Sequence, residues 1–165
     1  MSLEPLLQAP LAIQIHAFSA VAAFPLGAFV LWRKKGTRLH KLLGRIWVVL
    51  MLAVATSALF IHEMRMIGPF SPIHIFSIVT YVTLYRALRA IIVDRNVAAH
   101  RAGMRGAYLW TLMLAGAFTF LPGRRMHMVL FGPEAGWTPS LIVIGAAMLC
   151  AWLLSRRLRP RPAAA

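Results

Sequence analysis

The sequence is poor in acidic residues, in charge of any kind and in cysteine. It has four Asp and Glu residues and 13% charged residues, against 60% hydrophobic residues and a mean hydropathy of +0.72. Paired-carboxylate catalysis therefore has no support, and the chain contains no glycine-rich phosphate loop and no recognisable nucleophile motif. The single cysteine, Cys150, can form no internal disulfide. These absences exclude an ordinary soluble domain and the common hydrolase and transferase classes.

The sequence instead contains long apolar runs. The sequence predicts an all-α integral membrane protein, because each run approaches the roughly 20 residues that cross a bilayer core. The first run is too long for a cleavable signal peptide, and its leader carries no positive charge. Residues 1–154 are expected to form a single transmembrane domain, followed by a basic cytoplasmic tail at 155–165. The five predicted spans cover about 10–32, 46–62, 74–93, 107–122 and 138–154.

The positive charges are unevenly distributed between the loops. With the N-terminus outside, fifteen of the 18 Lys and Arg residues fall in the inner segments 33–45, 86–105 and 156–161. Only Arg65, Arg124 and Arg125 remain outside. The positive-inside rule therefore predicts a multi-pass protein of the bacterial inner (plasma) membrane, with the N-terminus outside and the C-terminus cytoplasmic. The net charge of +14 then needs no nucleic acid to explain it, and the inner face should attract anionic lipid headgroups.

A phrase near the start of the chain recurs. Residues 15–19 read Ile-His-Ala-Phe-Ser and residues 73–77 read Ile-His-Ile-Phe-Ser, 58 residues later. Each copy is followed by a basic segment with a second histidine, His40 or His100, and these are 60 residues apart. This pattern predicts a duplicated two-helix unit, with repeat A at about 11–62 and repeat B at about 72–122. The copies would form a pseudo-symmetric four-helix bundle, and the fifth helix at 138–154 would lie beside it.

The first predicted span places one histidine and a strip of small side chains on a single face, at His16, Ser19, Ala20, Ala23 and Gly27. Small residues in a membrane helix mark where another helix or a flat ligand comes close. The corresponding face of repeat B carries large aromatic residues, which we expect to pack against this strip. Its members are His74, Ser77, Tyr81 and Tyr85. Pro25 is expected to kink the first span.

Helix starts are marked by candidate caps. Thr37 should cap a helix that begins near Arg38, Asn96 should cap its counterpart, and Ser71 should cap the third span, with Pro72 next. On these helices His40 and His100 share the apolar face, whereas the neighbouring Lys and Arg residues turn away from it.

Two histidine layers follow from the repeat. His16 and His74 would lie near the outer face, and His40 and His100 near the inner face, about 24 Å apart along the helices. Facing imidazoles, small residues where a porphyrin lies flat and cations for its propionates are what b-type haem requires. The leading hypothesis is therefore transmembrane electron transfer through haem b. The same histidines also suit a proton- or quinone-linked transporter, or they tie helices together in a cofactor-free accessory or assembly subunit of a membrane complex.

A weaker hypothesis concerns copper. Thioether and imidazole groups suit Cu(I), and both occur at the outer ends of the spans. The spacing is loose, because residues at i and i+2 do not share a helix face. The six candidate ligands are His62, Met64, Met66, Met126, His127 and Met128.

Three motifs resemble those of a family of bacterial predicted membrane proteins of unknown function. They are the Ile-His-x-Phe start at His16 and the loop motifs His-Lys-Leu-Leu-Gly-Arg at 40–45 and His-Arg-Ala-Gly-Met-Arg at 100–105. The resemblance covers roughly residues 11–130 and implies a multi-span inner-membrane protein without naming an activity. The layout alone is also similar to the cytochrome b561-like electron carriers, although here the inner histidines stand at the membrane edge.

Overall fold

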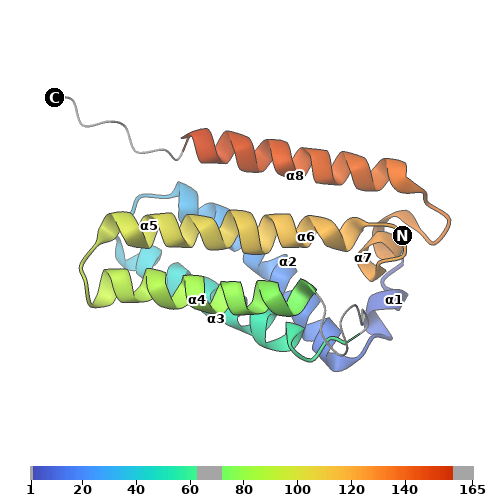
Figure 1. Cartoon of the computed structure of the whole chain (residues 1–165), viewed down its shortest axis with the longest axis horizontal. Coiled ribbons are helices and arrows are strands. Elements are labelled where there is room, and N and C mark those ends of the chain that lie inside the picture. The colour runs from blue at the N-terminus through green and yellow to red at the C-terminus, as the bar shows by residue number, and fades with distance from the viewer. Residues whose placement is uncertain (1, 63–71, 158–165) are drawn as a thin grey trace.

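The computed structural model describes residues 2–62 and 72–157, and every regular element in these two ranges is helical (Figure 1). The elements are α1 (Glu4–Leu7), α2 (Leu11–Trp32), α3 (Arg38–Ala58), α4 (Pro72–Ile92), α5 (Val97–Gly106), the π-helix η1 (Ala107–Leu114), α6 (Ala115–Ala117), the 3₁₀ turn η2 (Phe118–Phe120), α7 (Arg125–Phe131) and α8 (Trp137–Arg157).

The chain is an all-helical membrane protein. Four helices are long and apolar enough to span a bilayer, namely α2, α3, α4 and α8. The segment Val97–Phe120 and α7 form a fifth if this pair, bent by 64°, counts as one span. The second and fourth spans begin earlier than hydropathy predicted, because their helices start inside the basic segments at Arg38 and Val97. Helix α2 runs through Pro25 to Trp32 without interruption.

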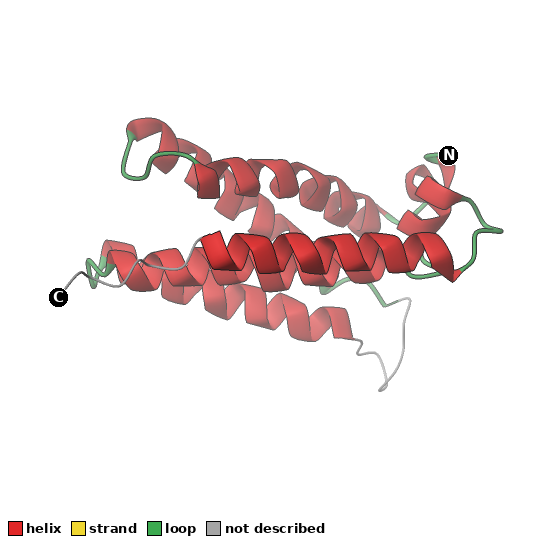
Figure 2. Ribbon diagram, turned by 90° about the horizontal axis from the view of Figure 1, so that it is seen from above, coloured by secondary structure: helices red, strands yellow, loops and turns green. Residues whose placement is uncertain are grey.

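The bundle consists of α2, α3, α4 and the continuous helical segment α5–η1–α6–η2. Helix α2 packs against α3 and η1, whereas α4 packs against α3, α5 and η1, so α2 and α4 stand on one diagonal. Helix α8 lies along the outside of the continuous rod α5–η1–α6–η2, as Figures 1 and 2 show. The four-helix bundle with a peripheral fifth helix therefore agrees with expectation. The internal duplication itself stays a prediction.

The bundle has two different ends. We call the end with residues 33–37 and 93–96 the basic end, and the end with α1 and α7 the α7 end (Figure 1). At the basic end, the Thr37 hydroxyl accepts from the His40 backbone N–H across 3.1 Å, and the Asn96 side chain accepts from the Ala99 N–H across 2.9 Å. Both predicted caps are thus confirmed. The expected cap Ser71 lies outside the described residues.

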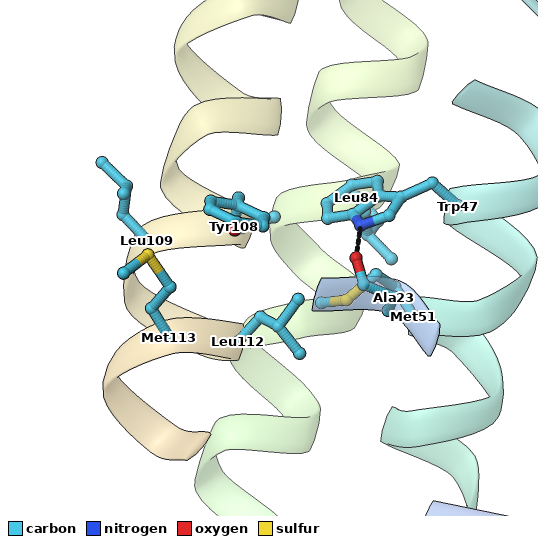
Figure 3. Packing of buried hydrophobic residues seen from close by; sticks show 9 residues of the cluster. Ala23, Trp47, Met51, Leu84, Tyr108, Leu109, Leu112 and Met113 are labelled. Atoms are coloured by element: carbon cyan, nitrogen blue, oxygen red, sulfur yellow. Dashed lines mark hydrogen bonds between the residues drawn. The ribbon is translucent and has the colours of Figure 1, made fainter. Parts of the chain in front are cut away.

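The core lies at mid-depth and combines α2, α3, α4 and η1. Its largest members are Trp47, Met51, Leu84, Tyr108 and Leu112 (Figure 3). Large apolar side chains are also exposed on the outside of the bundle, including Phe29 and Trp32. Packing rather than hydrophobic exclusion from water therefore distinguishes the two faces of each helix.

The buried face of α4 differs from the sequence prediction. Thr80 and Leu84 point inward, whereas Tyr85 is 66% exposed and Tyr81 is half-buried beside α3. The expected packing of Tyr81 and Tyr85 against the small residues of α2 was therefore wrong.

Two other aromatic rings fill the small-residue strip. The Trp47 indole Nε1–H donates to the Ala23 carbonyl oxygen across 3.0 Å. A Cβ placed on Gly27 would lie 2.6 Å from the Tyr108 ring and would also collide with the Trp47 indole. Gly27 is therefore required because it lets α3 and η1 approach α2.

The π-helix supplies much of this core. Within η1, the residues Ala107, Tyr108, Leu109, Thr111, Leu112 and Met113 are all buried. The wider turn of a π-helix brings more side chains to one face than an α-helix does, and such segments are frequent at functional sites. The Thr111 hydroxyl donates to the Ala107 carbonyl oxygen across 2.6 Å, so this polar side chain is satisfied within its own helix.

Candidate functional site

At the α7 end, His16 is bonded to the neighbouring helix. Its Nδ1 lies 2.9 Å from the Val54 carbonyl oxygen and 3.5 Å from the Ser57 hydroxyl, both on α3. The Ser57 hydroxyl donates to the backbone of its own helix, so the carbonyl bond is what orients the ring. With Nδ1–H donating to a carbonyl, Nε2 is the nitrogen that can accept a proton or bind a metal.

The second histidine of this layer, His74, has a different neighbour. It is 6% exposed on α4, and its ring centroid lies 5.4 Å from that of His62, which follows α3. His16 thus contacts α3, and His74 contacts His62, which follows α3. His62 was predicted as a copper ligand, and its pairing with His74 has no signal in the sequence.

A shallow groove opens beside the His16 bond. Its volume is about 460 Å³, and it lies between α2 and α3. Apart from the hydroxyls of Thr56 and Ser57 its lining is apolar, formed by Leu11, Ala12, Ile15, Ala53 and Phe60. The Thr56 hydroxyl also lies 2.6 Å from the Tyr81 hydroxyl, so it bonds α3 to α4. Polar contacts of His16, Ser57, Thr56 and Tyr81 thus connect α2 to α3 and α3 to α4 near the α7 end.

At the basic end, His40 and His100 belong to neighbouring parts of the bundle. His40 on α3 lies within electrostatic range of His100 on α5, and both rings are half-buried. The His100 Nδ1 lies 2.9 Å from the Ala87 carbonyl oxygen on α4. This close approach of α4 and α5 depends on Gly103, where a Cβ would lie 2.6 Å from the Cβ of Ala87. The predicted turning of Lys41 away from the histidine face is also seen.

Cations lie near His40. Arg33 and Lys35 act electrostatically on His40, and Arg101 acts on both Lys35 and Arg105. The Lys35 ammonium donates to the carbonyl oxygens of Leu31 and Arg33 at the end of α2, where a helix leaves carbonyls without partners. Burial, and after it the charge of Arg101, lower the pKa of Lys35 below the usual lysine value. Several cations therefore act on one another and on His40 at this end of the bundle.

Within this cluster two buried nitrogens have no hydrogen-bond acceptor or donor in the described part of the protein. They are Arg33 Nε and His40 Nδ1. The Arg33 guanidinium lies over the Phe29 ring at 5.3 Å, which positions it at the end of α2. Because buried polar atoms are nearly always hydrogen-bonded in proteins, these two nitrogens mark a place where a ligand would add bonds.

The residues of the copper hypothesis are placed as follows. His127 is 1% exposed, with Nδ1 3.0 Å from the Phe120 carbonyl oxygen and Nε2 2.9 Å from the Ala135 carbonyl oxygen. Both nitrogens therefore face backbone oxygens, and the Ser140 hydroxyl is a further neighbour at 3.0 Å. Met126 and Met128 are half-buried on α7, and Met64 and Met66 lie outside the described residues. In the described ranges no three His, Cys, Asp or Glu side chains could share a metal ion.

Haem b fits these sites in its ligand chemistry but not in the position foreseen for its ring. Imidazoles within electrostatic range of each other and adjacent cations suit an anionic porphyrin at the basic end. The small-residue face of α2, expected to lie against the porphyrin, is instead covered by Trp47 and Tyr108.

The comparison with known families gives one match. A family model described as "Predicted membrane protein (DUF2306)" matches residues 13–157. Searches of the curated proteins and of the solved structures gave no match. The matched segment contains all four histidines of the two layers.

Proposed function

We propose that this chain, which belongs to the DUF2306 family of predicted membrane proteins, carries electrons across a bacterial inner membrane through b-type haem. In this proposal His40 and His100 are the haem ligands at the basic end, and His16 and His74 are those at the α7 end. The basic end faces the cytoplasm, as the positive-inside rule requires. Lipid and other subunits of a membrane complex are the expected partners.

One observation carries the proposal. In each layer, a backbone carbonyl of a neighbouring helix lies 2.9 Å from the Nδ1 of one histidine, Val54 for His16 and Ala87 for His100. Histidines that bind metals commonly use this second bond, because it fixes the tautomer and the ring orientation and raises the basicity of the other nitrogen. The two imidazoles are thus held with Nε2 available for a ligand.

The chain's own groups would have three tasks. The carbonyls of Val54 and Ala87 accept from the Nδ1–H groups, so each ring is oriented with Nε2 as the nitrogen left for a ligand. Arg101 and Arg105 supply positive charge for the carboxylates of a porphyrin. The packed core of Trp47 and Tyr108 separates the two ends and excludes water between them. When bound, haem would supply the one-electron chemistry that no side chain of this protein provides.

Two alternatives have observations of their own. The filled small-residue strip of α2 favours a cofactor-free accessory subunit, because the helices already pack without a ligand at mid-depth. The groove of about 460 Å³ beside His16 favours a quinone- or proton-linked role, since it is mostly apolar and its polar lining comes from Thr56 and Ser57. A cofactor assay separates both from the haem proposal.

The test is the haem content of the protein purified from haem-replete cells, measured as the pyridine haemochrome. We expect haem in the parent, a large loss in His100→Ala, and recovery when free imidazole is added to that variant. Lys41→Ala is the matched control, because Lys41 is exposed and adjacent to His40. A parent without haem, or a His100→Ala variant that retains full haem, would overturn the inner site.

A further inference from the structure

The basic end contains more positive charge than the protein itself neutralises. Arg33 and Lys35 of the loop 33–37 act electrostatically on His40, and Arg101 of α5 acts on Lys35. In the described ranges no carboxylate forms an ion pair with these cations. Asp94 pairs with Arg89 at 3.9 Å, and Glu4 and Glu134 belong to the α7 end. No carboxylate in the described ranges therefore offsets the repulsion among these cations.

The helix directions add to this potential. Both α3 and α5 begin at the basic end, so both point their positively charged N-termini at the cluster. Basic residues at helix N-termini are unfavourable, and Thr37 and Asn96 cap only one backbone N–H each. An anion placed here would stabilise both helix ends as well as the side chains.

Two buried nitrogens show where such an anion would bind. Arg33 Nε is a donor that lacks an acceptor in the described part of the protein, and His40 Nδ1 likewise has no partner there. His40 differs in this from His16, His100 and His127, each of which has its Nδ1 beside a backbone carbonyl. When Nδ1 carries the proton, a ligand acceptor would complete the hydrogen bonding of His40.

We infer that the basic end holds a binding site for a phosphate oxyanion, in which Arg33 Nε–H and His40 Nδ1–H donate to its oxygens while Arg101 supplies further charge. The phosphate belongs either to the headgroup of an anionic phospholipid or to free inorganic phosphate. Arg33 suits the first source, because it ends α2 beside the exposed Trp32, a residue type that marks the bilayer interface. The site uses the Nδ1 side of His40 and does not rest on haem binding.

The experiment compares lipid binding by native mass spectrometry of the purified protein, with short-chain phosphatidylglycerol and short-chain phosphatidylcholine as probes. We expect the parent to bind the anionic lipid preferentially and Arg33→Gln to weaken that binding about ten-fold, since charged hydrogen bonds are the strong ones. Arg33→Lys keeps the charge but loses the Nε–H, so it should also bind more weakly than the parent. Lys34→Gln, in the same loop and exposed, should stay within about two-fold of the parent.

A second arm distinguishes the source of the phosphate. Inorganic phosphate is titrated against thermal unfolding of the parent and of Arg33→Gln, with chloride at equal ionic strength as reference. Stabilisation by phosphate but not by lipid, lost in Arg33→Gln, would support the site with free phosphate as its ligand. Equal loss of lipid binding in Arg33→Gln and Lys34→Gln would overturn the proposed site, because it would show that the positive charge attracts lipid diffusely. If the parent neither prefers the anionic lipid nor is stabilised by phosphate, the proposed site would be overturned entirely. The haem content of Arg33→Gln is measured in parallel, so that a failure of the phosphate-site proposal can be distinguished from a failure of the electron-transfer proposal.

Discussion

The indole of Trp47 donates to the backbone carbonyl oxygen of Ala23 across 3.0 Å, and this bond joins α3 to the small-residue face of α2. Tyr108 covers the next turn of the same face. The feature that the sequence assigned to helix contact or to a flat ligand is thus used for contact between helices. Any cofactor would bind toward the two ends of the bundle, where the histidines are.

Gly27→Ala should destabilise the protein. The added Cβ collides with Trp47 and Tyr108, and overpacking of this kind costs roughly 1–3 kcal/mol of unfolding free energy. Gly44→Ala is the control, because a methyl group added there would meet nothing within 4 Å, and it should gain roughly 0.5–1 kcal/mol from better helix propensity. Denaturant unfolding in detergent measures both. Equal effects of the two substitutions would contradict the packing described.

Tyr81→Phe should weaken the contact between α3 and α4. The Tyr81 hydroxyl lies 2.6 Å from that of Thr56, and such a bond contributes about 0.5–1.5 kcal/mol. Tyr85→Phe should have little effect on thermal stability, because that side chain is 66% exposed. If Tyr85→Phe proved the more damaging change, the face of α4 assigned to the interior would be the wrong one.

Ser140→Ala should loosen the α7 end. The Ser140 hydroxyl is fully buried and donates to the Phe120 carbonyl oxygen across 2.5 Å beside the His127 ring. Its removal leaves buried polar groups less satisfied, at a cost of about 1–3 kcal/mol. Proteolysis within residues 121–136 should accelerate in this variant. Ser155→Ala, which removes an exposed bond to Trp152, should leave the rate unchanged, and an equal acceleration in both would argue against a specific role for Ser140.

The orientation can be tested by cysteine labelling. In a Cys150→Ser background, Lys34→Cys should react with a membrane-impermeant maleimide only from the cytoplasmic side, and Glu134→Cys only from the outside. Both positions are exposed. Labelling of both from the same side would mean that the bent pair Val97–Phe120 and α7 does not cross the membrane as one span.

Much of the fold follows from local features of the sequence. Hydropathy located the spans, and the caps Thr37 and Asn96 were visible because their side chains act within three residues. The inward face of α4 was misjudged because an α-helical period assigns Tyr81 and Tyr85 to it, whereas packing against α3 and η1 selects Thr80 and Leu84. The π-helical turn of η1 has no local sequence signal.

The candidate site was only partly foreseeable. The repeated motif pointed to His40 and His100, which lie within electrostatic range of each other, and their role as ligands stays a prediction. The carbonyl partners of His16 and His100 lie 38 and 13 residues away in sequence, and main-chain acceptors carry no residue signature. The partners of His127 were hidden for the same reason.

The central claim is best tested by a reduced-minus-oxidised difference spectrum of membranes from haem-replete cells that express the protein. The account predicts an α band of b-type haem that is absent from cells without the protein and is strongly reduced in the double variant His40→Ala, His100→Ala. A spectrum identical to that of non-expressing cells, with the protein present in the membrane in amount, would contradict it.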